Sequence, residues 1–208
     1  SIIFDCDGVL IDVTKSYDTT INKTISYVLK EIADITVDTP LTNELLLSFK
    51  STGGFNDEID ITYAGILCFI AAKKLNKNPT ELISDVINNA DDSGITYIEN
   101  FLKKIDVDVS DVKARLNYPS TDKNDLIHST FDQLFFGPEL YGRVFQKESK
   151  FSEKGFIEND NVIVNSKLIE ALKKRFNDKI AIVTGRGFNA ISSSLKEILN
   201  QFNVENSV

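Results

Sequence analysis

The sequence predicts an α/β fold in which a parallel sheet covered by helices is interrupted by a long helical insertion. Two observations support this prediction. Short apolar, β-rich runs stand near the two ends of the chain, SIIFD at residues 1–5 and KIAIVT at 179–184, and helical segments flank the second run. Between them, more than half of the chain has the apolar spacing of helices and carries few strand signals.

The run SIIFD is predicted to be a buried strand because Asp and Gly end it abruptly. Near the other end, SKLIEALKKRF predicts a helix at 166–176, KIAIVT a second buried strand, and ISSSLKEILNQF a helix at 191–202. Within the insertion, Asn78, Pro79 and Thr80 form a typical helix start. The helices predicted for the insertion cover residues 17–35, 39–50, 60–75, 78–90, 94–105 and 124–136.

These elements divide the chain into two predicted parts. Residues 1–14 and 152–208 would form the α/β core, and residues 15–151 the helical insertion. With 208 residues, of which 42% are hydrophobic and 26% charged, the chain is long enough for one domain or for a domain with an insertion.

The net charge of −8, from 23 Lys+Arg against 31 Asp+Glu, has the wrong sign for a general binder of nucleic acid or of an anionic membrane. No apolar stretch reaches the length of a membrane span, and no signal peptide precedes the first predicted strand, so we expect a cytoplasmic protein. No feature predicts an oligomeric state. Cys6 and Cys68 are too few for a disulfide framework or a thiolate metal site, and the single histidine, His128, lies in a helical segment, which argues against histidine-dependent catalysis.

Asp5 and Asp7 in SIIFDCDGVLID form the first candidate site. Alternation along a strand places their carboxylates on one side and turns Cys6 away, while Gly8 allows a conformation that a β-carbon would hinder. At the end of a parallel strand, this side faces the crevice where open α/β sheets bind ligands. Two close carboxylates repel each other and call for a shared proton or a cation, and Mg²⁺ fits an all-oxygen site. The alternative interpretation is a simple Asp-Gly turn that ends the strand.

The segment KIAIVTGRG shows the same pattern, because a predicted strand again ends in a polar residue and glycine. Thr184 and the Gly185 N–H would make a neutral cradle for phosphoryl oxygens. Together, FDCDGVLID and IVTGR resemble the first two motifs of the haloacid dehalogenase (HAD) superfamily, subfamily IA. That resemblance implies a Rossmann-like core with an inserted type 1 cap, and the predicted helical insertion stands where this cap belongs.

The resemblance also implies roles for single residues. Asp5 would be the nucleophile that attacks phosphorus, and Asp7 would protonate the leaving alkoxide and then take a proton from water. Mg²⁺ would be bound by Asp5 and by the backbone carbonyl of Asp7, and Thr184 would hold a phosphoryl oxygen. An aspartate at position 7 argues against true dehalogenases, which need no leaving-group acid, and favours a phosphatase or a phosphomutase.

Two further motifs of the superfamily are expected after the second one. They are a lysine that bridges nucleophile and phosphate, and an acidic pair that completes the metal site. The sequence contains neither in the expected context, and Lys196 is predicted to be a solvated helix residue. The sequence therefore fits either an incomplete phosphatase or a member that has lost catalysis.

A glycine pair interrupts the helical insertion in KSTGGFNDEID. With FFGPELYG and GFIENDNVIV, this segment resembles a little-characterised subfamily with a type 1 cap in which a GGFN loop lies in the cap. The resemblance implies that Gly54, Phe55, Asn56 and Asp57 determine substrate specificity, with Phe55 offering an apolar face and the next two residues polar contacts. The alternative is a helix-breaking turn in which Asn and Asp act as caps.

The leading hypothesis from the sequence is a Mg²⁺-dependent phosphomonoester hydrolase that acts on a small phosphorylated metabolite through an aspartyl-phosphate. A phosphomutase is the nearest alternative, and it would transfer phosphate between positions of one sugar without net release. A non-catalytic protein that binds a phosphate ligand is the alternative from another functional class. It would keep the phosphate cradle and lack the metal site.

Overall fold

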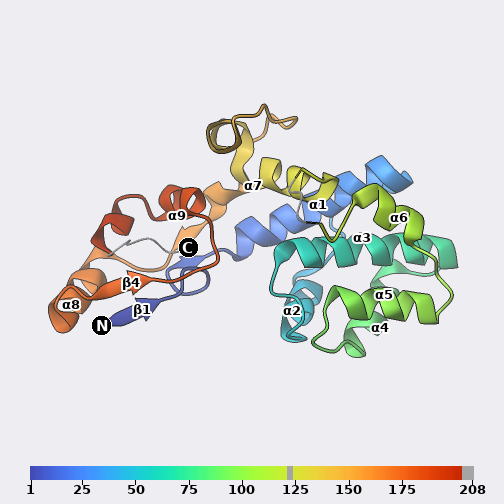
Figure 1. Ribbon diagram of the computed structural model, residues 1–208, viewed down its shortest axis with the longest axis horizontal. Helices are drawn as coiled ribbons and strands as arrows, with labels where there is room; N and C mark the ends of the chain where they lie inside the picture. Colours follow the sequence, from blue (N-terminus) through green and yellow to red (C-terminus); the bar gives the residue numbers. More distant parts are fainter. Residues whose placement is uncertain (121–123, 203–208) are drawn as a thin grey trace. The chain divides into compact units, whose positions relative to one another are not determined.

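The computed structural model describes residues 1–120 and 124–202 (Figure 1). The chain forms two compact units, an α/β unit of Ser1–Tyr17 with Phe135–Val208 and a helical unit of Asp18–Leu134. Both unit boundaries fall inside long helices, α1 (Thr14–Ala33) and α7 (Leu126–Phe145). The stretch 135–151, which the sequence-based division placed in the insertion, is therefore part of the α/β unit.

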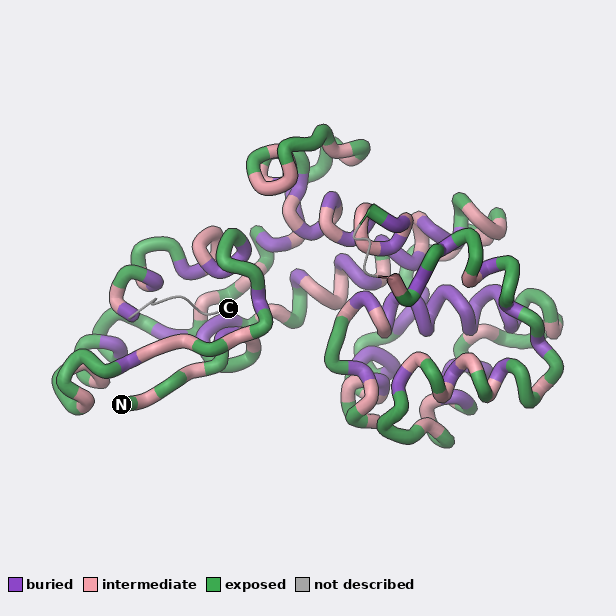
Figure 2. Tube along the Cα trace, viewed as in Figure 1, coloured by how far each residue is buried: buried purple, intermediate pink, exposed green. Residues whose placement is uncertain are grey.

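The helical unit confirms the helical character predicted for the middle of the chain. Helix α3 (Glu58–Leu75) is buried along most of its length (Figure 2). A helix that is apolar on nearly all sides must lie inside a bundle, and the two helices that follow it in the sequence pack against it. The other helices that lie entirely in this unit are α2 (Asn43–Ser51), α4 (Pro79–Asn88), α5 (Ile95–Lys104) and α6 (Ser110–Leu116).

The start of α4 follows from local sequence rules. The Asn78 side chain accepts hydrogen bonds from the backbone N–H groups of Thr80 and Glu81, and Pro79 occupies the first helical turn. Helix α6 was not predicted, since its seven residues are too few to show a period and no side chain caps its start. No helix in residues 1–120 and 124–202 combines the length and the hydrophobicity that a membrane crossing requires.

A parallel strand pair forms the centre of the α/β unit. Strands β1 (Ile2–Phe4) and β4 (Ile180–Ile182) lie side by side (Figure 1), with Ile2 opposite Ile180 and Phe4 opposite Ile182. This pairing confirms the prediction that the two apolar runs share a parallel sheet. Parallel strands need a long connection, which here contains the entire helical unit.

A second, antiparallel strand pair joins one segment that precedes the helical unit in the sequence and one that follows it. Its strands are short, and Ile11 pairs with Val162 and Asp12 with Asn161. The helices before and after β4 provide the predicted alternation of helix and strand. The remaining elements of the unit are β2 (Ile11–Asp12), a 3₁₀ helix η1 (Phe156–Asn159), β3 (Asn161–Val162), α8 (Ser166–Phe176), α9 (Phe188–Leu195) and a 3₁₀ helix η2 (Lys196–Gln201).

The hydrophobic core of the α/β unit covers one face of β1 and β4. The opposite face carries Ile3 and Val183, which are 63% and 60% exposed. The prediction of two buried strands is thus correct for one face of the strand pair only. Side chains alternate along a strand, and those on the other face do not pack against the core formed by the described residues. The buried residues of this core are Cys6, Leu10, Ile11, Val164, Ile169, Ile180, Ile191, Leu195, Leu199 and Phe202.

The helix predicted at 191–202 is interrupted. Helix α9 ends at Leu195, and the chain continues as η2. Lys196 has a φ of +50°, a left-handed conformation that an α-helix cannot contain. Lys196 is exposed, as predicted, but it stands at the break and not within a continuous helix.

Helix α7 is kinked at Gly137. This residue has a φ of +70° and is followed by Pro138, so the helix consists of two segments that meet there. A β-carbon on Gly137 would overlap with the backbone nitrogen of Gly155, and one on Gly155 would overlap with the carbonyl of Phe136. Two backbone segments of the α/β unit therefore touch at a pair of glycines.

We predict that Gly137→Ala destabilises the protein by roughly 1 to 3 kcal/mol, because the added methyl group combines backbone strain with overpacking. Gly142 in the same helix is the matched control. Among the described residues, a β-carbon there would meet the Lys147 carbonyl alone, at 3.6 Å, so Gly142→Ala should be neutral or stabilise the helix slightly. Urea unfolding of both variants measures the difference, and equal stability of the two would contradict the close packing at Gly137.

Candidate functional site

The candidate site lies where β1 and β4 end. Because the two strands are parallel and in register, their carboxyl ends lie at the same edge of the sheet. The N–H of Val183 donates to the carbonyl of Phe4 at 2.9 Å, so the pairing extends to the beginning of both polar turns. Residues 5–8 follow β1 and residues 184–186 follow β4. The structure thus brings together two segments that the sequence predicted to share a site.

The turn after β1 separates its side chains as predicted. The Cys6 carbonyl accepts N–H groups of Leu10 at 2.8 Å and Ile11 at 3.0 Å, and Gly8 makes the reversal with a φ of +74°. Cys6 points into the core, where burial raises the pKa of its thiol to about 12. The exposed Asp5 carboxylate accepts the N–H of Cys6 through Oδ1 at 2.6 Å. The Asp5 carboxylate therefore faces solvent, whereas the Cys6 thiol lies in the hydrophobic core.

Asp7 is more enclosed than Asp5. Its side chain is 31% exposed, and its Oδ1 accepts a hydrogen bond from Nη1 of Arg186 at 2.9 Å. Burial raises the pKa of the Asp7 carboxyl above its ordinary value, and the charge of Arg186 opposes this effect without cancelling it. The two aspartates thus differ in solvation and in partners, although one residue separates them.

Arg186 is the centre of a buried polar network. Its side chain is 1% exposed, and Nη2 donates to a carboxylate oxygen of Asp160 and to Oγ of Ser194 at 3.1 Å. Asp160 also accepts hydrogen bonds from Ser194 Oγ at 2.6 Å and from Ser16 Oγ at 2.5 Å. A buried guanidinium is therefore matched by two carboxylates, Asp7 and Asp160.

Aromatic rings complete the surroundings of Arg186. Its Cζ atom lies 5.5 Å from the ring centroid of Tyr17 and 5.6 Å from that of Phe135. These two rings are stacked, with centroids 5.0 Å apart and planes 4° from parallel. The attraction between a cation and aromatic faces adds to the ion pairs and further restricts the motion of the guanidinium.

Sequence reasoning missed Arg186, Asp160 and Ser194 as members of the site. Arg186 stands within the TGR segment and Asp160 within GFIENDNVIV, and the local pattern of these segments assigns no role to either charged side chain. Asp160 reaches the site because β3, which starts at the next residue, pairs with β2 beyond the Asp7 turn. Pairing between distant strands is not visible in the local pattern of either segment.

Thr184 and Gly185, the predicted phosphate cradle, lie at the same sheet edge. Thr184 is partly buried, and its Oγ1 accepts the N–H of Arg186 at 3.1 Å. Gly185 is exposed, and apart from its two chain neighbours no described residue has an atom within 4 Å of the place where its β-carbon would stand. A ligand oxygen can therefore approach the backbone here, and the cradle stays a prediction.

The residues at this edge fit a hard cation in their donor chemistry. The exposed Asp5 carboxylate and the Asp7 carbonyl are oxygen ligands of the kind that Mg²⁺ prefers. Within residues 1–120 and 124–202, no group of three or more His, Cys, Asp or Glu side chains is placed to hold a metal ion. The side chain of Asp7 is engaged by Arg186, so its backbone carbonyl is the donor that fits the predicted arrangement.

In the helical unit, two of the predicted specificity residues have packing roles. A β-carbon on Gly54 would lie 2.5 Å from the backbone nitrogen of Gly94, so two loops approach each other closely at this glycine. Phe55 is 1% exposed, and its ring meets that of Phe49 edge to face at 5.1 Å. The ring of Phe55 thus belongs to the core of the unit, and its predicted contact with a ligand stays a prediction.

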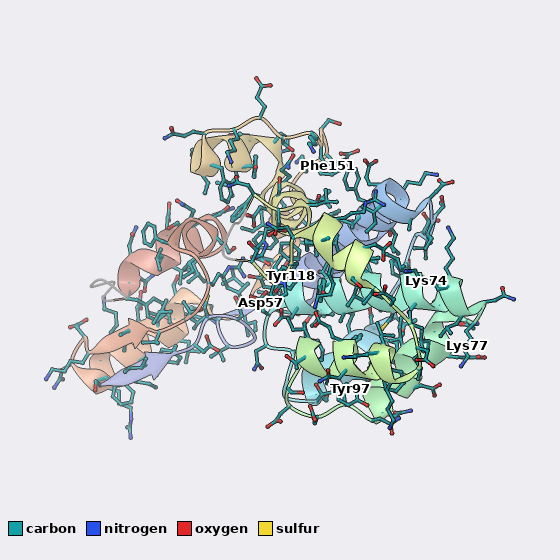
Figure 3. All side chains as sticks on the ribbon, turned by 45° about the vertical axis from the view of Figure 1, so that its right-hand side comes forward. Asp57, Lys74, Lys77, Tyr97, Tyr118 and Phe151 are labelled. Atoms are coloured by element: carbon teal, nitrogen blue, oxygen red, sulfur yellow. The ribbon has the colours of Figure 1, made fainter. Side chains whose placement is uncertain are left out.

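The next two residues begin helix α3. Asp57, labelled in Figure 3, is the N-cap, and its side chain accepts the N–H of Ile59 at 2.8 Å. Asn56 is exposed, and its side-chain amide donates to the Gly53 carbonyl at 3.4 Å. The structure thus contains the capping turn that the sequence offered as the alternative, and Asn56 alone in the loop has an exposed polar side chain without a capping role.

Two solved structures are similar to this chain in fold. Phosphatase Tt82 from Thermococcus thioreducens matches with a TM-score of 0.64 and 22% sequence identity, over 97% of this chain and 69% of that chain. A target of the Northeast Structural Genomics Consortium matches with a TM-score of 0.63 and 18% identity, over 99% of this chain and 68% of that chain. No protein-family model and no curated protein sequence matches the chain. At these identities the likeness shows a shared fold.

We predict that Asp57→Ala destabilises the protein by about 1 kcal/mol, because the first turn of α3 loses the acceptor for its N–H group. The neighbouring Asn56→Ala is the matched control and should change stability by less than about 0.5 kcal/mol, as is usual for exposed side chains. Thermal unfolding of both variants measures the difference. Unchanged thermal stability of Asp57→Ala would contradict the capping role of Asp57.

Proposed function

We propose that this chain belongs to a Mg²⁺-dependent phosphomonoester hydrolase that acts on a small phosphorylated metabolite through an aspartyl-phosphate on Asp5. The observation that carries the proposal is the parallel register of β1 and β4, which brings the turn at residues 5–8 and the turn at residues 184–186 to one edge of the sheet. The fold shared with phosphatase Tt82 supports the same class of activity.

Each aspartate has an environment that suits its proposed role. The exposed Asp5 carboxylate attacks phosphorus, the ester P–O bond breaks, and the leaving alkoxide takes the proton of the Asp7 carboxyl group. Water then gives a proton to Asp7 and attacks phosphorus, which releases phosphate and restores Asp5. Burial raises the pKa of Asp7, and a raised pKa helps a carboxyl group to carry a proton nearer to neutral pH.

The remaining residues of the sheet edge would bind the phosphoryl group. Thr184 Oγ1 and the N–H of Gly185 are neutral groups beside the end of β4 and would hold phosphoryl oxygens. When bound by the Asp5 carboxylate and the Asp7 carbonyl, Mg²⁺ would offset the repulsion between the carboxylate and the phosphate. The leaving group would be recognised by the helical unit, and the exposed amide of Asn56 is the candidate contact in the 53–57 loop.

One observation favours a second candidate function. Arg186 forms ion pairs with both Asp7 and Asp160 within the protein, and such a network can maintain a phosphate-binding turn without catalysis. A non-catalytic protein would bind a phosphate ligand at Thr184 and Gly185 and release no phosphate from an ester. Turnover of an ester separates the two candidates directly.

We predict that Asp5→Asn abolishes the Mg²⁺-dependent release of phosphate from p-nitrophenyl phosphate, because the amide cannot act as the nucleophile. Folding should be unchanged, since the Asp5 side chain is exposed. Asp178→Asn, at a largely exposed carboxylate paired with Lys173 in the same unit, is the matched control and should retain activity. Retained turnover in Asp5→Asn would remove Asp5 as the nucleophile.

Asp7→Asn should show an effect that depends on the leaving group. Loss of the general acid is expected to lower kcat/KM for an alkyl phosphate, which reports the step that releases the alcohol and not the later attack of water, by roughly 10²- to 10⁴-fold. The loss should be smaller for p-nitrophenyl phosphate, because p-nitrophenolate leaves without needing a proton. Steady-state kinetics with both esters checks this, and equal losses on the two substrates would contradict the acid role of Asp7.

A further inference from the structure

Arg186 has no role in the proposed reaction, yet it is the most enclosed charged group at the sheet edge. We infer that Arg186 is a positioning residue, whose guanidinium is fixed by Asp160 and Ser194 and holds one oxygen of the Asp7 carboxylate in place. The other oxygen is then left for proton transfer. This inference rests on the proposed function of Asp7 as the leaving-group acid.

The contacts of Asp7 are one-sided. Nη1 of Arg186 binds Oδ1 at 2.9 Å, and no hydrogen bond to Oδ2 comes from any described residue. A short carboxylate side chain that is partly exposed can otherwise change rotamer freely. The single charged hydrogen bond therefore fixes the direction of the carboxyl group and keeps Oδ2 available.

The guanidinium itself has little freedom. Nη2 binds both Asp160 and Ser194, and the aromatic rings of Tyr17 and Phe135 lie within 5.6 Å of Cζ. Because the guanidinium is planar and rigid, the direction of Nη2 toward Asp160 also sets the direction of Nη1. Asp160 thus acts on Asp7 through Arg186, across a buried network that solvent barely reaches.

Asp160 is in turn held by two hydroxyl groups. Ser194 on α9 and Ser16 on α1 each donate to its carboxylate, one to each oxygen. The chain of contacts therefore runs from two helices through Asp160 and Arg186 to the turn after β1. An ion pair that served stability alone would need no such alignment, since buried ion pairs contribute little net stability compared with apolar packing.

Kinetics of Arg186→Lys tests the positioning role, because lysine keeps the positive charge and loses the planar fork. We expect kcat/KM for an alkyl phosphate, which reports the step that releases the alcohol, to fall by roughly 10- to 100-fold, because misplacement of a catalytic group slows that step. For p-nitrophenyl phosphate, kcat/KM should stay nearly unchanged, since its leaving group does not need the Asp7 proton. Asp160→Asn should give the same pattern, because the amide cannot hold the guanidinium as tightly.

Two further variants make this experiment decisive. Arg143→Lys changes a largely exposed arginine that pairs with Glu139 in the same unit, and it should leave both substrates unaffected. Ser194→Ala removes one contact of the guanidinium and serves as the milder variant if thermal unfolding shows that Asp160→Asn does not fold. Parallel losses on both substrates in the folded variants would overturn the inference and leave Arg186 a structural residue.

A second readout does not depend on turnover. In ¹⁵N NMR spectra of the arginine side chains, a guanidinium locked by Asp7 and Asp160 should show separate Nη signals for Arg186. These signals should merge in Asp160→Asn and in Asp7→Asn, because rotation about the Nε–Cζ bond becomes faster. Merged signals in the unmodified protein, or separate signals that survive Asp160→Asn, would overturn the inference. If the protein releases no phosphate from either ester, the proposed function fails, and the NMR spectra still decide whether Arg186 holds Asp7.

Discussion

A buried positive charge organises the α/β unit. The Arg186 side chain is 1% exposed, and removing a guanidinium from water is costly unless carboxylates and hydrogen bonds replace the lost hydration. Asp7 comes from the turn after β1, Asp160 from the segment before β3, and Ser194 from α9. Because all of these partners must reach one guanidinium, the ends of both strand pairs and a helix are held together at the candidate site.

This network also explains why two aspartates so close in sequence can have different chemistry. Strand alternation leaves the Asp5 carboxylate exposed, and among the described residues its hydrogen-bond partner is the neighbouring backbone N–H of Cys6. Asp7 is drawn toward Arg186 and partly out of solvent, and burial raises its pKa. A nucleophile must stay ionised and an acid must carry a proton, and the difference in solvation suits the roles proposed for Asp5 and Asp7.

In the helical unit, packing and helix capping explain the residues of the GGFN loop. Gly54 and Gly94 allow two backbones to touch, Phe55 fills the core beside Phe49, and Asp57 caps α3. The same local residues that suggested a ligand loop are thus needed for the loop to fold. The fold shared with phosphatase Tt82 extends across nearly the whole chain at 22% identity, which fits packing requirements that many side chains can meet.

The sequence by itself determined the two apolar strands, most of the helices, the capped start of α4 and the outward direction of Asp5, because periodicity, alternation and caps are local properties. The parallel pairing of the two strands was indicated by the order of strands and helices along the chain. Only the tertiary structure decided that Arg186 meets Asp7, 179 residues away, and Asp160, 26 residues away. It also decided that Phe55 is buried and that the last helix breaks at Lys196. These features depend on which distant segments pack together, and the free energy of burying a charge or a ring depends on neighbours that no local pattern contains.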